Sequence, residues 1–175
     1  MKLEANSPLP FADHAFDAIY AESVLGITTE TILPVLLREI LRVLTPGGTF
    51  ITNDAIWKDE VSDEEIEKIN TACLYDFGMI QSLRRPARRS EWESALVEAG
   101  FRMKKVMEIN LQEAAIQQPI ASPFQYYKKI SSLLNVPWQF RAFRFNQALE
   151  KNHQTDYQYL ISYLFVTQNP QHRAG

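Results

Sequence analysis

The sequence predicts an α/β fold, formed by a single domain that spans residues 1–175. A chain of this length is near the usual size of one domain, and its composition, 46% apolar and 22% charged, is that of an ordinary globular protein. In its first half, β-prone runs alternate with amphipathic helical segments. A strand, a helix and a second strand joined by short connections are typical of a right-handed, parallel βαβ unit.

This βαβ unit covers residues 16–54. The β-prone run FDAIYA at residues 16–21 follows a polar turn and is the first strand. A helix comes next, because apolar residues recur at spacings of three and four: Leu33, Leu36, Leu37, Ile40, Leu41 and Leu44. The residues TPGG at 45–48 are expected to end it, since proline cannot continue a helix and glycine accepts a left-handed cap. The run TFITND at residues 49–54 is then the parallel neighbour of the first strand.

Two capping boxes predict the helices that follow. Ser62 with Glu65 opens the first, and Ser90 with Glu93 opens the second. The side chains expected on their buried faces are Ile66, Ile69, Cys73, Leu74 and Phe77 in the first helix and Trp92, Leu96 and Ala99 in the second. Gly100 is expected to cap the second helix.

The remainder of the chain adds two strands and an insertion. Residues 101–109 are β-prone and leave the second helix, and residues 157–166 are apolar on both faces, which is typical of a strand inside a sheet. Between them, residues 111–153 carry scattered prolines and clustered aromatic residues. We expect this segment to form a helical cap inserted before the last strand.

Charge and cysteine content exclude several classes of protein. The formal net charge is −3 and the isoelectric point is near 5.7, so no overall basic field draws the chain to nucleic acid or to anionic lipid. The single cysteine cannot form an internal disulfide and, with three scattered histidines, implies no metal site. No apolar run is long enough for a membrane helix and the opening residues lack an apolar leader, so we expect a cytoplasmic protein.

Three motifs carry a family resemblance: LPFADHAFDAIY at residues 9–20, LREILRVLTPGG at 37–48 and EWESALVEAGF at 91–101. In this order and spacing they closely resemble strands four, five and six of class I S-adenosylmethionine-dependent methyltransferases of the type 11 group. The resemblance covers about residues 4–110. It implies a partial Rossmann-like sheet of strands four to seven, in which residues 157–167 are the last, antiparallel strand.

One feature of that family is missing from the sequence. None of the six glycines forms the G-x-G of the loop that binds the methionine end of the cofactor, and nothing ahead of the first motif supplies the first three strands. The resemblance therefore implies the C-terminal part of a methyltransferase domain. Such a part carries half of a cofactor site and is expected to bind S-adenosylmethionine weakly or not at all.

The resemblance also implies site residues. Those expected beside the adenine are Ala5, Asn6 and Ser7, and those expected beside the methionine and ribose are Ala21, Glu22, Ser23 and Leu25. Glu22 and Asp54 follow neighbouring parallel strands, whose carboxyl ends border the ligand crevice of open α/β sheets, and are the candidate catalytic carboxylates. The alternatives are a solvated turn for Glu22 and a turn cap for Asp54.

Aromatic and basic residues supply candidates for binding a small-molecule acceptor. Trp57, Tyr75, Tyr126, Tyr127 and Trp138 are expected to line an apolar acceptor pocket, or else to belong to the core. The arginines of residues 84–89 either meet an acidic acceptor or form a solvated loop face. His14 is a candidate base by residue type alone, the alternative being an ordinary loop histidine.

Two rival interpretations of the sequence are a short-chain dehydrogenase and a non-catalytic fragment. A short-chain dehydrogenase requires Y-x-x-x-K, whereas Tyr126 and Tyr127 are followed at that offset by Ile130 and Ser131. A non-catalytic fragment stays open, because without a first strand the edge of residues 16–21 would be unpaired. That edge is expected to bind a second copy of the chain or a complementing N-terminal half.

Overall fold

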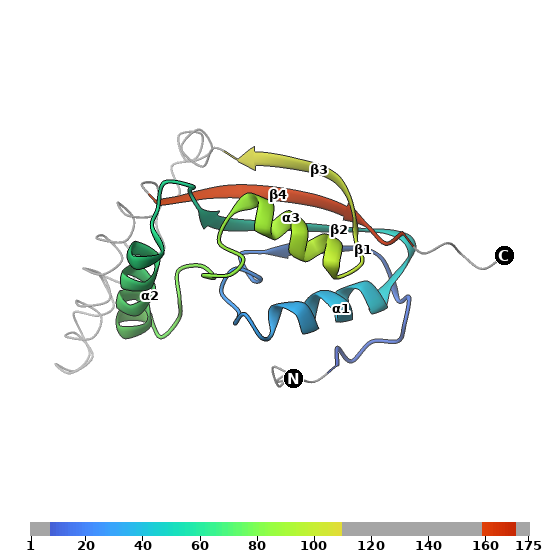
Figure 1. Ribbon diagram of the computed structural model, residues 1–175. Coiled ribbons are helices and arrows are strands. Elements are labelled where there is room, and N and C mark those ends of the chain that lie inside the picture. Colours follow the sequence, from blue (N-terminus) through green and yellow to red (C-terminus); the bar gives the residue numbers. More distant parts are fainter. Residues whose placement is uncertain (1–7, 110–158, 171–175) are drawn as a thin grey trace, which may run out of the picture.

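The computed structural model describes residues 8–109 and 159–170, which form one mixed sheet with three helices (Figure 1). The strands are β1 (Phe16–Glu22), β2 (Leu44–Trp57), β3 (Arg102–Ile109) and β4 (Leu160–Gln168), in the spatial order β1-β2-β4-β3. β1 and β2 are parallel, whereas β4 lies antiparallel to both β2 and β3. The α/β class, the parallel first pair and the antiparallel last strand are all confirmed.

Helix α1 (Leu33–Val43) connects the parallel strands. Its first turn contains a proline, which is tolerated there because the missing N–H has no helical partner. The helix ends at Val43, and Leu44 is already extended and begins β2, so the prediction that TPGG caps the helix is wrong. Pro46 disfavours a helical conformation at the residue before it, and the chain is therefore extended ahead of the glycines. Gly47, with a φ of 79°, lies inside β2 instead.

Helix α2 (Asp63–Phe77) lies at one end of the sheet (Figure 1). The predicted capping box is confirmed, because Ser62 Oγ accepts from the Glu65 N–H at 3.2 Å and Glu65 Oε2 accepts from the Ser62 N–H at 3.0 Å. Its buried face is narrow, since it packs on the small cluster of Trp57, Val61, Ile66, Ala87 and Leu160. Leu74 falls outside this face and is 52% exposed, which corrects its expected place in the core.

Helix α3 (Arg89–Glu98) begins without the predicted capping box. Ser90 is already inside the helix, whereas an N-cap requires non-helical backbone, and the extended Arg88 occupies that position. At the other end the prediction holds. Gly100 has a φ of 105°, its N–H donates to the Val97 carbonyl, and the Phe101 N–H donates to the Leu96 carbonyl. This pair of bonds is a Schellman cap.

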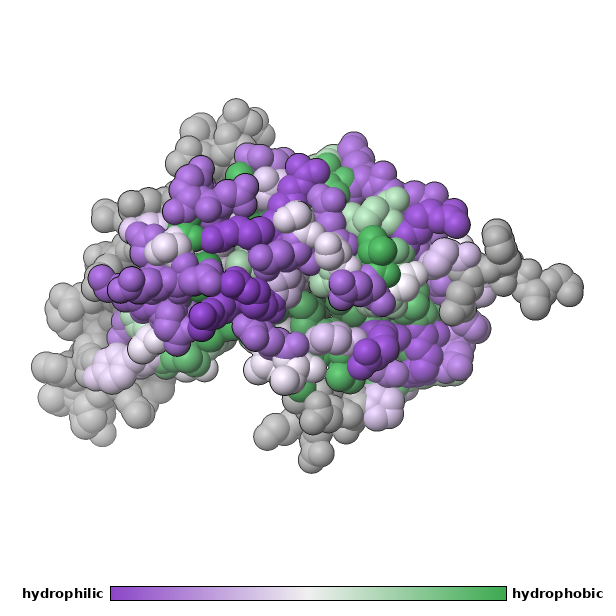
Figure 2. All heavy atoms as spheres, viewed as in Figure 1, coloured by the Kyte–Doolittle hydropathy of each residue, from purple (hydrophilic) through white to green (hydrophobic). Residues whose placement is uncertain are grey.

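Helices α1 and α3 cover the same face of the sheet (Figure 1). The core between the helices and the sheet includes Leu37, Ile40, Phe50, Trp92, Leu96 and Phe165. From the helix side the surface is largely hydrophilic, and hydrophobic residues show mainly in the gaps between hydrophilic areas (Figure 2). β1 is an edge strand of the described sheet, and Asp17, Ala18, Tyr20 and Glu22 along it are exposed.

Several sequence predictions lie outside the described residues. They are the inserted cap at 111–153 with Tyr126, Tyr127 and Trp138, and the expected adenine contacts Ala5, Asn6 and Ser7. Within residues 8–109 and 159–170, none of the helices has the length and apolarity that crossing a bilayer requires.

Candidate functional site

The carboxyl end of β1 lies beside β2, with Glu22 in register with Asn53, and β2 continues to Trp57. Ligands of open α/β sheets bind in the crevice outside such strand ends. Two loops border this edge: residues 23–32, which follow β1, and residues 78–88, which follow α2. We refer to this region as the carboxyl-end site.

Glu22 presents its side chain to solvent at the last position of β1. Tyr20 lies two residues earlier and on the same face of the strand, next to Glu22. Partial desolvation, together with the neighbouring Glu22 carboxylate, raises the pKa of Tyr20. The two side chains therefore offer an accessible carboxylate and a protonated phenol next to each other.

Ser23 turns the chain away from the sheet. Its φ of 52° is in the left-handed region, which residues other than glycine rarely adopt, and its N–H donates to the Asn53 carbonyl at 2.8 Å. Strained backbone of this kind is enriched at ligand-binding positions. Beside it, the buried Asn53 Oδ1 accepts no hydrogen bond from the part of the chain that the structure describes. An unsatisfied acceptor at the strand end is compatible with a donor group on a bound molecule.

Asp54 points inward rather than into the crevice. It is 1% exposed, Oδ1 accepts from the Gly26 N–H at 2.8 Å, and Oδ2 accepts from Thr52 Oγ1 at 2.5 Å. Burial raises the pKa of its carboxyl group, although these hydrogen bonds act in the opposite direction. The geometry supports the turn-capping alternative, in which Asp54 positions the loop that follows β1.

The remaining residues expected near the cofactor divide between surface and core. Ser23 is exposed, whereas Ala21 is partly buried and packs against the main core. Leu25 is 0% exposed and its side chain belongs to that core, and its expected place beside the methionine and ribose stays a prediction. An apolar side chain that begins a loop gains more by packing between α1 and the sheet than by remaining at the crevice.

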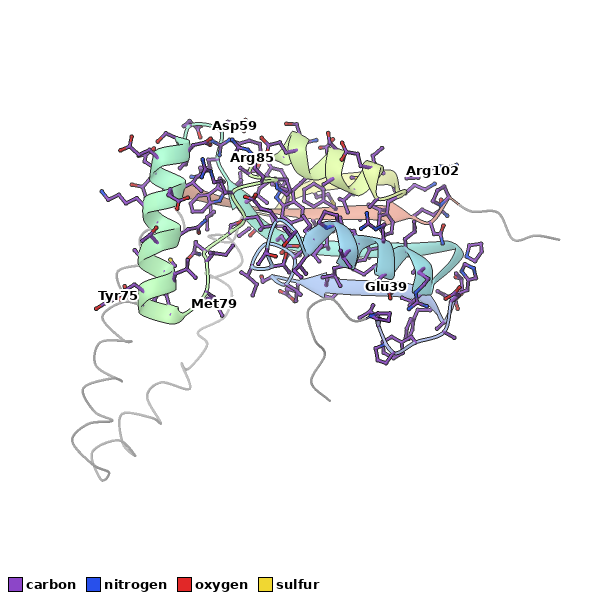
Figure 3. The ribbon with its side chains drawn as sticks, turned by 60° about the horizontal axis from the view of Figure 1, so that its bottom comes forward. Glu39, Asp59, Tyr75, Met79, Arg85 and Arg102 are labelled. Carbon is purple, nitrogen blue, oxygen red and sulfur yellow. The ribbon has the colours of Figure 1, made fainter. Side chains whose placement is uncertain are left out.

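The two described aromatic residues of the expected acceptor pocket are not brought together. Trp57 is 1% exposed and its Nε1–H donates to the Leu83 carbonyl at 2.9 Å, so it is a core residue. Tyr75 is 76% exposed and lies with Met79 at the end of α2 that is remote from Arg85 (Figure 3). Residue type alone does not separate a pocket aromatic from a core aromatic, which is why the sequence left both possibilities open.

The basic run is bonded within the chain. Ion pairs join Arg84 to Glu67 at 3.3 Å, Arg85 to Asp63 at 2.7 Å and Arg89 to Glu93 at 2.7 Å. Arg88 donates to the backbone carbonyls of Lys58 and Val61. These contacts support the loop-face alternative over an anion site.

Neither His14 nor a metal-binding cluster lies at the carboxyl-end site in the described residues. The His14 ring nitrogen Nδ1 lies 3.1 Å from the Leu44 carbonyl oxygen, at the amino ends of the strands and away from the carboxyl-end site. In the described ranges, no three histidine, cysteine or acidic side chains gather in a way that would hold a metal ion.

Three site residues were not anticipated from the sequence: Gly26, Asn70 and Ser82. Asn70 is 8% exposed and bonds the backbone of residues 81 and 82, whereas Ser82 is 0% exposed and bonds the Ala55 carbonyl near the end of β2. Their bonds join positions 11 to 28 residues apart in the sequence, and no local pattern marks such pairs.

Comparison with known proteins agrees with this architecture. Residues 2–52, which contain the whole of the first and second motifs, match the family model described as "Methyltransferase domain". The chain is 15% identical to a putative sarcosine dimethylglycine methyltransferase from Galdieria sulphuraria, with a TM-score of 0.61 over 92% of this chain and 56% of that one. The [4+2]-cyclase SpnF is 20% identical, with a TM-score of 0.58 over 97% and 55%. The chain has part of a class I methyltransferase fold.

Among curated proteins, relatives of this partial methyltransferase fold include sterol 24-C-methyltransferase from Yarrowia lipolytica, 25% identical over 130 residues. A second is sterol 24-C-methyltransferase ERG6B from Gibberella zeae, 26% identical over 131 residues. Each alignment covers 73% of this chain and 33% of the relative. The chain thus spans about one third of the length of the curated relatives that it matches.

Proposed function

We propose that this chain takes part in the transfer of a methyl group from S-adenosylmethionine to a small-molecule acceptor. The observation that carries the proposal is the parallel β1–β2 pair, which brings Glu22 and Ser23, at the carboxyl end of β1, next to Asn53 of β2. All three lie in or next to the range matched by the methyltransferase family model, which ends at residue 52.

We propose that the chain positions the methyl acceptor and accepts a proton from it. The cofactor supplies an electrophilic methyl group on its sulfonium, so the protein has to align the acceptor, exclude water and remove a proton where the nucleophile carries one. The accessible Glu22 carboxylate is suited to accept a hydrogen bond or a proton, and Asn53 Oδ1 is an acceptor without a partner in the described residues. Ala5, Asn6 and Ser7 stay proposed for the adenine, and Tyr126, Tyr127 and Trp138 for the acceptor.

The proposed activity involves a partner polypeptide. Among the described strands, β1 pairs with β2 alone, and its outer positions, including the 56% exposed Tyr20, are open to solvent. The matched structures extend well beyond the aligned part, since this chain covers 55% to 56% of the two described above. We propose that a complementing N-terminal half of a methyltransferase domain pairs with the edge of residues 16–21, and that the complex is cytoplasmic. A homodimer through the same edge is the alternative.

The test is amide NMR of the ¹⁵N-labelled chain titrated with S-adenosylhomocysteine. Even weak binding should shift the amides of residues 20–26 and 53–54 and leave those of β3 unchanged. Glu22→Gln should reduce the shifts, whereas Glu98→Gln, a matched change of an exposed glutamate on α3, should not. Millimolar ligand that shifts none of these amides, or shifts only β3, would contradict the proposal.

The partner is tested by light scattering with size-exclusion chromatography. A chain that is monomeric alone, and gains affinity for S-adenosylhomocysteine when a polypeptide with the missing strands is added, is the expected result. A stable dimer of the chain alone would favour the homodimer.

A further inference from the structure

Buried polar side chains join three separate segments at the carboxyl-end site. The segments are the loop after β1, the end of β2 and the loop after α2. Asp54, Asn70 and Ser82 are 1%, 8% and 0% exposed, so water competes little for their hydrogen bonds. Together with Gly26 we call these residues the polar lock.

The first half of the lock ties the β1 loop to β2. Asp54 accepts from the Gly26 N–H and from the hydroxyl of Thr52, so each carboxylate oxygen has a defined partner. Gly26 fits because it lacks a side chain: a Cβ there would lie 3.2 Å from Asp54 Oδ1 and 3.5 Å from Ser82 Oγ. The first distance is shorter than most Cβ contacts and the second is an ordinary contact, so a side chain at this position would press mainly on the Asp54 carboxylate.

The second half ties the α2 loop to the same strand end. Ser82 Oγ donates to the Ala55 carbonyl at 2.8 Å. Asn70, from α2, donates through Nδ2 to the Ser82 carbonyl at 2.8 Å and accepts through Oδ1 from the Gln81 N–H at 2.9 Å. Because Ala55 directly follows Asp54, the two loops are fixed to adjacent residues of β2.

We propose that the polar lock consists of positioning residues that set how the two loops meet at the mouth of the carboxyl-end site. The neighbouring apolar residues contribute unequally: Leu25 is buried, whereas Val24 and Ile27 are 48% and 40% exposed. Leu25 therefore anchors the loop to the core, and the Asp54–Gly26 bond fixes the conformation of the residues beyond it. This inference rests on the proposed function only where it concerns the ligand.

The decisive test compares Asp54→Asn with Asp54→Ala in the full chain. Asparagine retains an oxygen that can accept from Gly26, whereas alanine leaves the buried N–H without a partner. We expect Asp54→Ala to speed hydrogen exchange of the Gly26 amide about tenfold, Asp54→Asn to stay within about threefold, and β3 amides to change less than about twofold. A uniform acceleration in β3 and the loop would overturn the positioning role, as would an unchanged Gly26 amide in Asp54→Ala.

Ligand binding provides a separate readout. Asp54→Ala should weaken the S-adenosylhomocysteine response about tenfold and Asp54→Asn much less. If the exchange pattern is as expected but the unaltered chain shows no response to the ligand, the lock stands and the proposed function fails. If the ligand response is unaltered in Asp54→Ala, the lock does not shape the site and the inference is wrong.

A second variant covers the case in which Asp54→Ala does not fold. Gly26→Ala keeps every polar group but places a methyl group against Asp54 Oδ1 and Ser82 Oγ. It should speed exchange at residues 25–28 and at 81–83 together, because both loops contact that position. Acceleration confined to one loop would show that the two are not coupled through the lock.

Discussion

The two ends of β1 are held by different chemistry. At the carboxyl end, the polar lock fixes the following loop through buried bonds to neutral backbone groups. At the amino end, residues 8–15 are held to α1 by Arg42, which donates to Asp13 at 2.6 Å, to Glu39 at 2.8 Å and to the carbonyls of Leu9 and Phe11. The side chains of this arginine and Asp13 are 28% and 66% exposed.

The two ends of β1 differ in their access to water, and this difference determines how much their bonds contribute to stability. Exposed ion pairs are screened by salt and contribute little individually, so the amino end relies on several bonds made by one guanidinium. Buried bonds are hardly screened, but each partner becomes costly if it is left unsatisfied. We therefore expect the carboxyl end to be sensitive to mutation and the amino end to be sensitive to ionic conditions.

The largest effect is expected from Asn70→Ala. The change removes the acceptor of the Gln81 N–H and a donor to the Ser82 carbonyl in a buried region, and we expect the free energy of unfolding to fall by about 3 kcal/mol. Urea denaturation at low and high salt measures this loss, which should be the same in both. Thr71→Ala, on the exposed side of the same helix, is the control and should change little. A loss that disappears at high salt would mean that the two ends do not differ as described.

A smaller effect is expected from Arg42→Ala. Removing the guanidinium breaks its bonds to Asp13, Glu39 and two carbonyls, and should lower Tm by roughly 3–5 °C at low ionic strength. Because salt already screens these contacts, the loss should be clearly smaller in about 0.5 M salt. Arg38→Ala on the same helix is the matched control. Equal losses at both salt concentrations would show that packing, not charge, holds this end.

The smallest effect concerns pH: the contributions of Asp54 and Glu39 to the free energy of unfolding should change with pH in opposite directions. Burial raises the pKa of Asp54, so its contribution to stability is present below its unfolded-state pKa and is lost as pH rises through the folded value. The hydrogen bond from Arg42 lowers the pKa of Glu39, so its contribution is present above the unfolded-state pKa and is lost as pH falls. Unfolding measured from about pH 2 to about pH 8 should lose the first dependence in Asp54→Asn and the second, which falls below the ordinary glutamate pKa, in Glu39→Gln. Slopes of the same sign for both residues would contradict these assignments.

Local sequence signals predicted most of the fold. The apolar spacing of α1, the Ser62–Glu65 box and Gly100 each depend on residues within four positions of one another, and each is confirmed. The Ser90–Glu93 box failed because the same short pattern also occurs inside a helix, where its backbone is already helical.

The candidate site was less predictable. The motifs placed Glu22 and Asp54 at neighbouring strand ends, but they did not show that one carboxylate faces solvent and the other is 1% exposed. That difference depends on Gly26 and Ser82, which approach Asp54 only after the strands, α1 and α2 have packed. Contacts between residues so far apart produce no regular spacing of residue types, so they cannot be predicted from one sequence.

The strand order has a consequence for how the polypeptide is made. β4 lies between β2 and β3, yet it is the last of the described strands to leave the ribosome. Until then β3 has no described neighbour to pair with, and one side of β2 is open along the residues that later bind β4. Assembly of the sheet must therefore wait until synthesis has passed residue 168. A nascent chain that is interrupted between residues 109 and 168 exposes unpaired strand edges, which are prone to aggregate and would need chaperones to shield them.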